Sequence, residues 1–494
     1  MSGTPGVQAE QSPAQRPSNR LDAFFHISAR GSTVQREVRG GLATFFTMAY
    51  IVVLNPLILG GAKDVNGAQL DLGALTTSTA LVAAVMTLAM GVAGGYPFAI
   101  AAGLGLNAVV AFQLGAQLSW PEAMGAVVLE GLVITLLVLT GLRETVMHMI
   151  PLALKKAISV GIGLFIAFIG VVDAGLVRRI PDVAGTTVPV QLGVGNRLIG
   201  WPTVVFVVGL LLTIILFARR VRGAILIGIV ATSVFAIVLN AIVDVGPMFG
   251  PGGVNPRGWA LNVPDLPSSL AGAPDFSLLG DFSLFGSFAR VGAITAVLFV
   301  FTLMLSDFFD TMGTIIGVGG EAGLLDEQGR LPGAVRVLLI DSVAAVAGGA
   351  ASASSNTTYI ESAAGVGEGA RTGLASVVTA LGFVVALFAT PLVEVVPFEA
   401  ATPALVVVGF LLMAQVRDIP WDDYGVAIPA FLTIVLMPFT FSITNGIGAG
   451  VISYAVIKVA QGRWREPGWL LWIVAVAFVI YFAIEPVERL LGVT

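Results

Sequence analysis

Long apolar runs alternate with short polar stretches along almost the whole chain. Each run has roughly 17 to 25 residues, which as a helix matches the hydrocarbon thickness of a bilayer. Fourteen runs of this kind are predicted to span a membrane. They lie near 40–60, 75–95, 98–117, 122–142, 152–172, 201–217, 223–243, 288–313, 333–350, 352–367, 372–392, 400–416, 424–441 and 443–460. One more run, near 469–485, starts with Trp469 and Trp472, which suit an interfacial anchor, so it could be an extra C-terminal helix that spans the bilayer or lies flat.

The order of the runs predicts an internal duplication. Seven runs precede a long loop rich in Pro, Gly and Asp, and seven follow it. Because each half has an odd number of spans, the second half should be inverted in the membrane relative to the first. The predicted organisation is a disordered cytoplasmic tail (1–20), a first inverted repeat (21–243), an extracellular loop (244–287), a second inverted repeat (288–460) and a C-terminal hydrophobic segment with its tail (461–494).

Two polar or glycine-broken segments occupy the third position of each half. Residues 352–371 read SASSNTTYIESAAGVGEGAR, and residues 97–107 contain a proline, two close glycines and an amide. Hydrocarbon has no water to satisfy such groups, so a polar segment at membrane depth must be buried in protein or line a cavity. Interrupted helices at matching positions of two repeats indicate the binding site of a transporter, although small residues are also common wherever membrane helices pack closely.

A few side chains in these segments are candidates for the site. Gly105 permits close approach of a backbone, and Asn107 can both donate and accept a hydrogen bond, unless it simply bonds a neighbouring helix. Glu361, preceded by Ile360, is predicted in the first turn of a half-helix, and Thr358 belongs to the polar stretch before it. The alternative for Glu361 is a helix-end carboxylate at a water interface.

Two aspartates form a third cluster, in the run VLFVFTLMLSDFFDTMGTIIGVGG. Asp307 and Asp310 are three residues apart and therefore neighbours on one face of a helix. A charged residue in so apolar a run costs roughly 2.5 to 3.5 kcal/mol on insertion scales, so function or firm pairing must hold the pair there, unless the span ends early and both face the cytoplasm. Glu130 and Asp341 also lie within apolar runs and could be structural hydrogen bonders.

Composition agrees with a polytopic membrane protein and narrows its chemistry. Of the 494 residues 56% are hydrophobic and 11% charged, and the mean hydropathy is +0.94, far above that of a soluble protein. With no cysteine and only two histidines, the chain is predicted to have no disulfide, no metal site and no cofactor. Nothing in it points to nucleic acid. The N-terminal residues lack the apolar core of a signal peptide.

Basic residues predict the orientation. With the N-terminus in the cytoplasm, most Lys and Arg residues between the spans fall inside, and the long loop 244–287, almost free of them, falls outside. The inside set comprises Arg143, Lys155, Lys156, Arg219, Arg220, Arg222, Arg330, Arg336, Arg371, Arg417, Lys458, Arg463 and Arg465. The exceptions are Arg178, Arg179 and Arg197.

The candidate groups suit one kind of solute. Carboxylates accept hydrogen bonds from ring and exocyclic N–H groups, and the free backbone N–H groups of half-helices donate to ring or carbonyl acceptors. A neutral, planar solute rich in hydrogen-bonding groups fits this set, and a buried carboxylate can also take up a proton. An anion carrier would favour a basic residue at mid-depth, and these spans offer none.

Five blocks of the sequence resemble the AzgA-type adenine/guanine/hypoxanthine permeases of the nucleobase/ascorbate (xanthine/uracil) transporter superfamily. The blocks are TFFTMAYIVVLNPLIL, PFAIAAGLGLNAVVAF, KKAISVGIGLFIAFIGVVDAGL, SDFFDTMGTIIGVGG and TTYIESAAGVGEGARTG. The resemblance covers residues from about 20 to 485. It implies an all-α fold of fourteen transmembrane segments in two inverted repeats, with short strands in segments 3 and 10, a core domain (spans 1 to 4 and 8 to 11) and a gate domain (spans 5 to 7 and 12 to 14).

The resemblance also implies a function and site residues. The function is import of purine nucleobases across the plasma membrane by proton symport, with an elevator-type movement of core against gate, in a homodimer. Asp307 and Glu361 would bond the purine, and Gly105 and Asn107 would line its site, together with Ile360 and Ala102. Glu361, Asp307, Asp310 and Thr358 would couple or support proton movement. Ala102-Gly103-Leu104 stands where family members often have Pro-Gly-Met, which could shade substrate preference.

Two alternatives remain at this stage. A uracil or xanthine carrier, or an anion transporter, would have the same fold. An intramembrane aspartyl protease could also use two buried aspartates, but a dyad that shares a proton needs carboxyl groups facing each other from separate elements. Asp307 and Asp310 share one helix turn, and no GxGD stretch is present.

Overall fold

The computed structural model describes residues 20–141, 150–179, 190–250, 253–267, 269–326 and 330–490. Most of the predicted tail 1–20 lies outside these residues. Within them, eight helices are long and apolar enough to cross a membrane by length and composition. They are Val34–Gly61, Leu72–Gly94, Trp120–Leu139, Leu152–Asp173, Trp201–Ala218, Ala224–Val243, Phe398–Asp418 and Ile443–Ala460. The chain is therefore a mostly helical, multi-pass membrane protein.

The elements follow the predicted runs closely. In the first half they are α1 (Arg20–Phe25), η1 (Ser28–Arg30), α2 (Val34–Met48), α3 (Ile51–Gly61), α4 (Leu72–Ala89), η2 (Met90–Gly94), β1 (Ile100–Ala102), α5 (Leu104–Ala108), η3 (Val109–Leu114), α6 (Trp120–Leu139), α8 (Leu152–Asp173), β2 (Val177–Arg179), β3 (Val190–Leu192), α9 (Trp201–Ala218) and α10 (Ala224–Val243). Side-chain caps fix several starts: Asp71 accepts from the Ala74 N–H before α4, and Ser119 and Glu122 form a capping box on α6.

The second half begins with two short strands. Its elements are β4 (Phe249–Gly250), β5 (Gly253–Val254), α11 (Gly286–Val291), α12 (Ala293–Glu321), α13 (Ala334–Ala350), β6 (Asn356–Thr358), α14 (Ser362–Gly367), α15 (Gly373–Ala386), α16 (Thr390–Val393), α17 (Phe398–Ala401), α18 (Pro403–Met413), η4 (Ala414–Asp418), α19 (Tyr424–Phe439), α20 (Ile443–Ala460) and α21 (Trp469–Leu490). Helix α12 extends well past the predicted limit near residue 313, so Asp307 and Asp310 lie inside it rather than at its end. The leftover apolar run forms α21.

Two three-residue strands interrupt the helices at the polar segments. β1 and β6 pair antiparallel, with Ile100 opposite Thr358 and Ala102 opposite Asn356. Two flanking hydrogen bonds extend the pairing: the Gly103 N–H donates to Ser355 O, and the Tyr359 N–H donates to Ala99 O, both over 2.9 Å. Extended backbone is satisfied here because each strand uses the other, which is the condition for non-helical chain inside a membrane protein.

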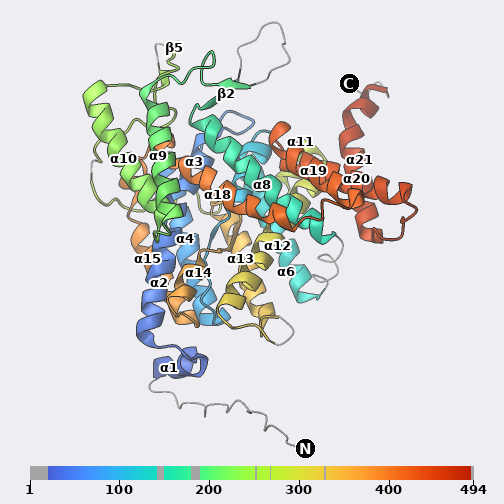
Figure 1. Cartoon of the computed structure of the whole chain (residues 1–494), viewed down its shortest axis with the longest axis horizontal. Helices are drawn as coiled ribbons and strands as arrows, with labels where there is room; N and C mark the ends of the chain where they lie inside the picture. Colours follow the sequence, from blue (N-terminus) through green and yellow to red (C-terminus); the bar gives the residue numbers. More distant parts are fainter. Residues whose placement is uncertain are drawn as a thin grey trace, which may run out of the picture.

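The helices form two groups, one of which packs around this strand pair. This group comprises α2, α3, α4, α6, α13, α14 and α15, and all of it except α3 lies in the lower half of the view in Figure 1. α8, α9, α10, α18, α19 and α20 pack on one another in the upper half. α12 contacts members of both groups, and α21 lies against α20 and α12. We refer to these as the strand group and the outer group.

Close helix contacts depend on glycine pairs. In the outer group, a Cβ at Gly163 on α8 would lie 2.6 Å from Gly409 O on α18, and a Cβ at Gly409 would lie 2.4 Å from Gly163 O. In the strand group, Gly91 and Gly373 face each other in the same way. Such small residues let backbones approach closely where lipid supplies no hydrophobic driving force.

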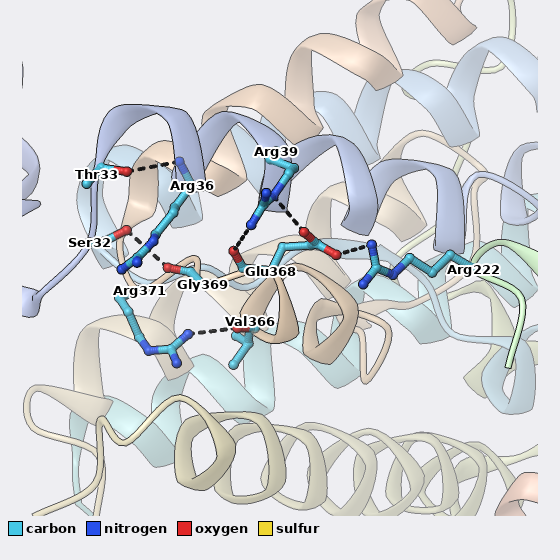
Figure 2. A network of polar contacts seen from close by, with 9 residues as sticks. All are labelled: Ser32, Thr33, Arg36, Arg39, Arg222, Val366, Glu368, Gly369 and Arg371. Carbon is cyan, nitrogen blue, oxygen red and sulfur yellow. Dashed lines mark hydrogen bonds and ion pairs between the residues drawn. The ribbon is translucent and has the colours of Figure 1, made fainter.

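An ionic contact joins the two groups at one end of α14 (Figure 2). Glu368, next to the end of α14, pairs with Arg39 of α2 over 2.6 Å and with Arg222, which stands before α10. The Glu368 side chain is 7% exposed, whereas Arg39 and Arg222 are 61% and 71% exposed. Because the arginines are well solvated, each pair contributes about 1 kcal/mol or less.

Candidate functional site

A cavity of about 510 Å³ lies between the strand group and the outer group. This volume is in the range of pockets that hold small molecules. Its lining comes from both groups and comprises Tyr50, Leu104, Gly105, Leu106, Ile158, Ser159, Ile162, Ser306, Asp310, Thr314, Thr358, Tyr359, Ile360, Glu361, Val408, Leu411, Leu412, Gln415 and Asp418.

The two interrupted segments meet at this cavity. α5 begins directly after β1, so Gly105 lies in its first turn and faces Ile162 of α8. α14 begins after β6, and Glu361 occupies its N-cap position. Both strands end in small or polar residues whose backbone groups are already hydrogen-bonded to the other strand. The chain can therefore turn from strand to helix at these points.

Glu361 is held by a phenol. The Tyr50 hydroxyl donates a short hydrogen bond to Glu361 Oε1. Tyr50 lies between α2 and α3, which together form the apolar span Val34–Gly61. A second phenol, Tyr359, donates to Ala102 O in the adjacent strand. Two aromatic rings and one carboxyl group therefore form one wall of the cavity.

Asp310 faces the cavity from another wall, and Asp307 does not. The Asp310 side chain is exposed in the cavity, one helical turn from Thr314 and Ser306 on α12. Asp307 is buried and does not line the cavity. Three residues on a helix are about 60° apart around its axis, which is enough to separate the surroundings of the two aspartates.

A buried polar network supports the strands from behind. Asp341 of α13 accepts hydrogen bonds from Thr358 N (2.9 Å), Thr358 Oγ1 (2.7 Å) and Thr311 Oγ1 (2.7 Å). Ser355 Oγ donates to Glu130 Oε2 of α6 over 3.0 Å. These bonds fix the position of β6, and Thr358 also lines the cavity. Asp341 and Glu130 therefore support the wall that carries Glu361.

The outer group supplies an apolar face. Ile158, Ser159 and Ile162 of α8 line it, and α18 adds three aliphatic side chains beyond them. The lining then reaches Gln415 and Asp418 in η4. Asp418 Oδ2 lies 3.3 Å from Lys156 Nζ, and Asp418 is about half exposed, so this end of the cavity opens toward solvent.

Some of the predicted site residues line the cavity and others do not. Gly105, Thr358, Ile360, Glu361 and Asp310 line it. Asp307, Asn107 and Ala102 are buried and do not line the cavity. The Ala102 carbonyl oxygen accepts a hydrogen bond from Tyr359, which does line it.

Sequence reasoning missed the phenol and amide groups of the cavity, mainly Tyr50, Tyr359 and Gln415. A tyrosine within the apolar block TFFTMAYIVVLNPLIL was the available indication, because a buried phenol requires a hydrogen-bond partner.

The lining defines what the site can bind. Among the described lining residues there is no Lys or Arg. The carboxyl groups of Asp310 and Glu361 and two phenols stand against an aliphatic face, and a third carboxyl group, that of Asp418, lies at the exposed end. No group of three or more His, Asp and Glu residues that could hold a metal ion is found within the described part of the chain. Such a cavity suits a planar solute with N–H groups on its edges and apolar faces.

Comparison with known proteins shows the family of the chain. Residues 35–448 match the family model described as Permease family, Xan_ur_permease. The guanine/hypoxanthine permease PbuG of Bacillus subtilis is 36% identical over 477 residues, covering 94% of this chain and 99% of that protein. The adenine permease AdeQ of Escherichia coli is 37% identical over 467 residues, covering 94% and 96%.

Solved structures share the fold at low identity. The transmembrane domain of a cyanobacterial bicarbonate transporter, BicA, has a TM-score of 0.55 at 15% identity, covering 84% of this chain and 97% of that one. The murine anion transporter Slc26a9 in the inward-facing state has a TM-score of 0.56 at 10% identity, covering 92% and 74%.

The cavity lies between two groups of helices that include those long and apolar enough to cross a membrane, and the family match shows that the chain is a membrane permease. The chain belongs to the xanthine/uracil permease family, within the nucleobase/ascorbate transporter superfamily, and the resemblance drawn from its five sequence blocks is confirmed. Its family and relatives are permeases and not enzymes, which excludes the aspartyl protease.

Proposed function

We propose that the protein imports purine nucleobases, namely adenine, guanine and hypoxanthine. The observation that carries the proposal is the cavity in which Glu361 and Asp310 stand opposite an aliphatic wall. Two carboxyl groups can accept from the N–H edges of a purine, and the apolar wall can cover its ring faces. Relatives named as guanine/hypoxanthine and adenine permeases, matched over almost their full length, support it.

Within the site the two aspartates have different roles. Asp310 lines the cavity and is the carboxyl group that would contact the base, together with Glu361. Gly105 allows the base to lie close to the backbone of α5, and Ile360 and Thr358 complete the wall.

The buried residues act from outside this contact. Asp307 would support proton coupling from behind Asp310, rather than bond the base as the sequence had predicted. Asn107 and Ala102 would shape the wall from behind.

Transport is driven by protons in this account. Carboxyl groups at membrane depth are the usual proton carriers of coupled transporters. Asp307, Asp310 and Glu361 have no Lys or Arg partner among the ion pairs of the described residues, so protonation is their available form of neutralisation. A symporter would load a proton and a base together at this site.

The proposed movement is of the elevator type. Fourteen segments in two inverted repeats would form a core from the strand group and a gate from the outer group, with strands β1 and β6 in segments 3 and 10. The cavity lies between these groups, where such a movement would carry the substrate. In the plasma membrane, with a cytoplasmic N-terminus, the exposed end at Asp418 would face the cytoplasm, and two copies would form a homodimer.

Other substrates of the same fold are disfavoured. A bicarbonate or other anion carrier would be expected to place a cation in its site, and the described lining has none. Uracil or xanthine carriers remain the alternative, because their substrates also present N–H groups.

A test is uptake of labelled hypoxanthine by cells that lack their own purine permeases. Wild-type protein should support uptake that unlabelled purines compete and unlabelled uracil and bicarbonate do not. Glu361→Gln should lower uptake at least tenfold at equal surface amount, because a hydrogen bond to a charged acceptor is worth roughly 1.5 to 3 kcal/mol. Asp281→Asn, an exposed loop carboxyl, is the matched control and should leave uptake unchanged. Uptake of uracil with no competition by purines would overturn the proposal.

A further inference from the structure

We propose that Tyr50 is a positioning residue that sets purine selectivity by donating to one oxygen of Glu361, so that this oxygen is a weaker acceptor for the base than the other. The inference rests on the proposed function, since it assumes that a purine edge meets Glu361. Tyr50 lines the cavity, but the proposed function assigns it no contact with the base.

The geometry commits the phenol to the carboxyl group. The Tyr50 hydroxyl donates to Glu361 Oε1, and the tyrosine is 1% exposed, so its ring cannot swing freely. Among the described residues, Tyr50 is the one side-chain donor that Glu361 meets. Both residues line the cavity, so Oε2 is the oxygen with all of its acceptor capacity free for a solute, whereas Oε1 already accepts one hydrogen bond.

Neighbouring groups do not take over the role of Tyr50. The Tyr359 hydroxyl donates to Ala102 O and is therefore engaged elsewhere. Asp310 also faces the cavity but is itself an acceptor, so it cannot replace the phenol as a donor to Glu361.

Purines differ in what they present to such a carboxylate. Guanine carries N1–H and the 2-amino group side by side, and two parallel N–H groups suit a carboxylate with both oxygens free. Hypoxanthine has N1–H but no 2-amino group. Because Oε1 already accepts from Tyr50, a second hydrogen bond at this oxygen is weaker, so the 2-amino group of guanine gains little at Glu361. Guanine and hypoxanthine should therefore bind about equally well.

The experiment compares inhibition constants for uptake of labelled hypoxanthine. In the wild type, unlabelled guanine and hypoxanthine should compete within about threefold of each other, since they make the same bond. In Tyr50→Phe, the freed oxygen should strengthen guanine relative to hypoxanthine by roughly tenfold, the worth of one hydrogen bond to a charged acceptor. A ratio measured within one variant does not depend on how much protein reaches the membrane.

Tyr96→Phe is the matched control. Its hydroxyl donates to Pro332 O over 2.5 Å and lies outside the cavity lining, so losing it removes a phenol hydrogen bond without touching Glu361. This variant should keep the wild-type ratio.

The outcomes separate this inference from the function on which it rests. An unchanged ratio in Tyr50→Phe, or the same change in Tyr96→Phe, would overturn the inference and leave purine transport standing. If Tyr50→Phe gives no measurable uptake, the wild-type ratio decides, and a guanine preference of tenfold or more would contradict the weakened acceptor at Oε1. Uptake of adenine that neither guanine nor hypoxanthine inhibits would also overturn the inference alone. Absence of uptake for every purine would overturn both.

Discussion

Asp307 and Asp310 show how far the surroundings of two residues can differ within one helix turn. Asp310 faces the cavity, and Asp307 is buried outside its lining. A buried carboxyl group is costly at membrane depth, so a functional role is expected for Asp307. We assign base contact to Asp310 and proton coupling to Asp307.

The two roles predict different kinetics. Asp310→Asn should raise the KM for hypoxanthine by roughly tenfold or more, because the base loses a charged acceptor. Asp307→Asn should leave the KM within about threefold and lower the maximal rate instead, since the contact with the base persists while proton loading fails. Concentration series of labelled hypoxanthine at equal surface amount measure both quantities. A large rise in KM for Asp307→Asn with none for Asp310→Asn would reverse the assignment.

The sequence predicts which residues form the site better than it predicts which way their side chains point. Polar side chains in apolar runs are costly enough to be noticed, which is how Glu361, Asp307, Asp310 and Asn107 were found. An apolar run does not show which side of its helix faces the cavity, because no polar stripe distinguishes a solvated face from a buried one. Tyr50 was missed because a tyrosine in a membrane helix is unremarkable until its partner is known.

At the scale of elements, strand breaks and glycine contacts position the site. Proline and glycine in residues 97–107 predicted an interruption, and the structure places β1 and α5 there. The pairing of α8 with α18 through Gly163 and Gly409 could not be predicted, since glycines are frequent throughout the chain and their partners are far away in sequence.

The glycine contact predicts a measurable cost. Gly409→Ala places a Cβ 2.4 Å from Gly163 O, so α8 and α18 must move apart. Overpacking of this kind costs about 1 to 3 kcal/mol. Thermal unfolding of detergent-purified protein should show a lower midpoint. Gly468→Ala is the control, because a Cβ there meets nothing within 4 Å, and equal midpoints for the two variants would contradict the packing argument.

At the scale of the whole molecule, the two helix groups are joined at Glu368 by an ion pair with Arg222, whose side chain is well exposed (Figure 2). Weak contacts suit surfaces that must separate. In the proposed elevator movement, Arg222 belongs to the gate, whereas Arg39 and Glu368 belong to the core, so the first pair must break and the second must persist.

Cross-linking distinguishes these pairs, and the chain has no native cysteine to interfere. Arg222→Cys with Glu368→Cys, joined by a cleavable thiol reagent, should reduce hypoxanthine uptake to background, and reducing the linker should restore it. Arg39→Cys with Glu368→Cys should cross-link without loss of uptake. Full activity with the first pair joined would mean that the two groups do not move against each other.

The sequence predicts the individual helices better than it predicts how they pack together. Long apolar runs fixed where the helices lie, because spanning a bilayer demands length and hydrophobicity. The division into two groups with a cavity between them depends on side-chain packing among elements remote in sequence, and apolar runs are too alike to encode partners visibly.

Coupled purine transport through one site is tested most directly with purified protein in liposomes. With an inward-directed proton gradient and labelled hypoxanthine outside, the account predicts accumulation above equilibrium that a protonophore abolishes. Liposomes with Glu361→Gln should stay at the empty-liposome level. Uptake that reaches only equilibrium and ignores the gradient would contradict symport, and accumulation by Glu361→Gln equal to wild type would contradict the site.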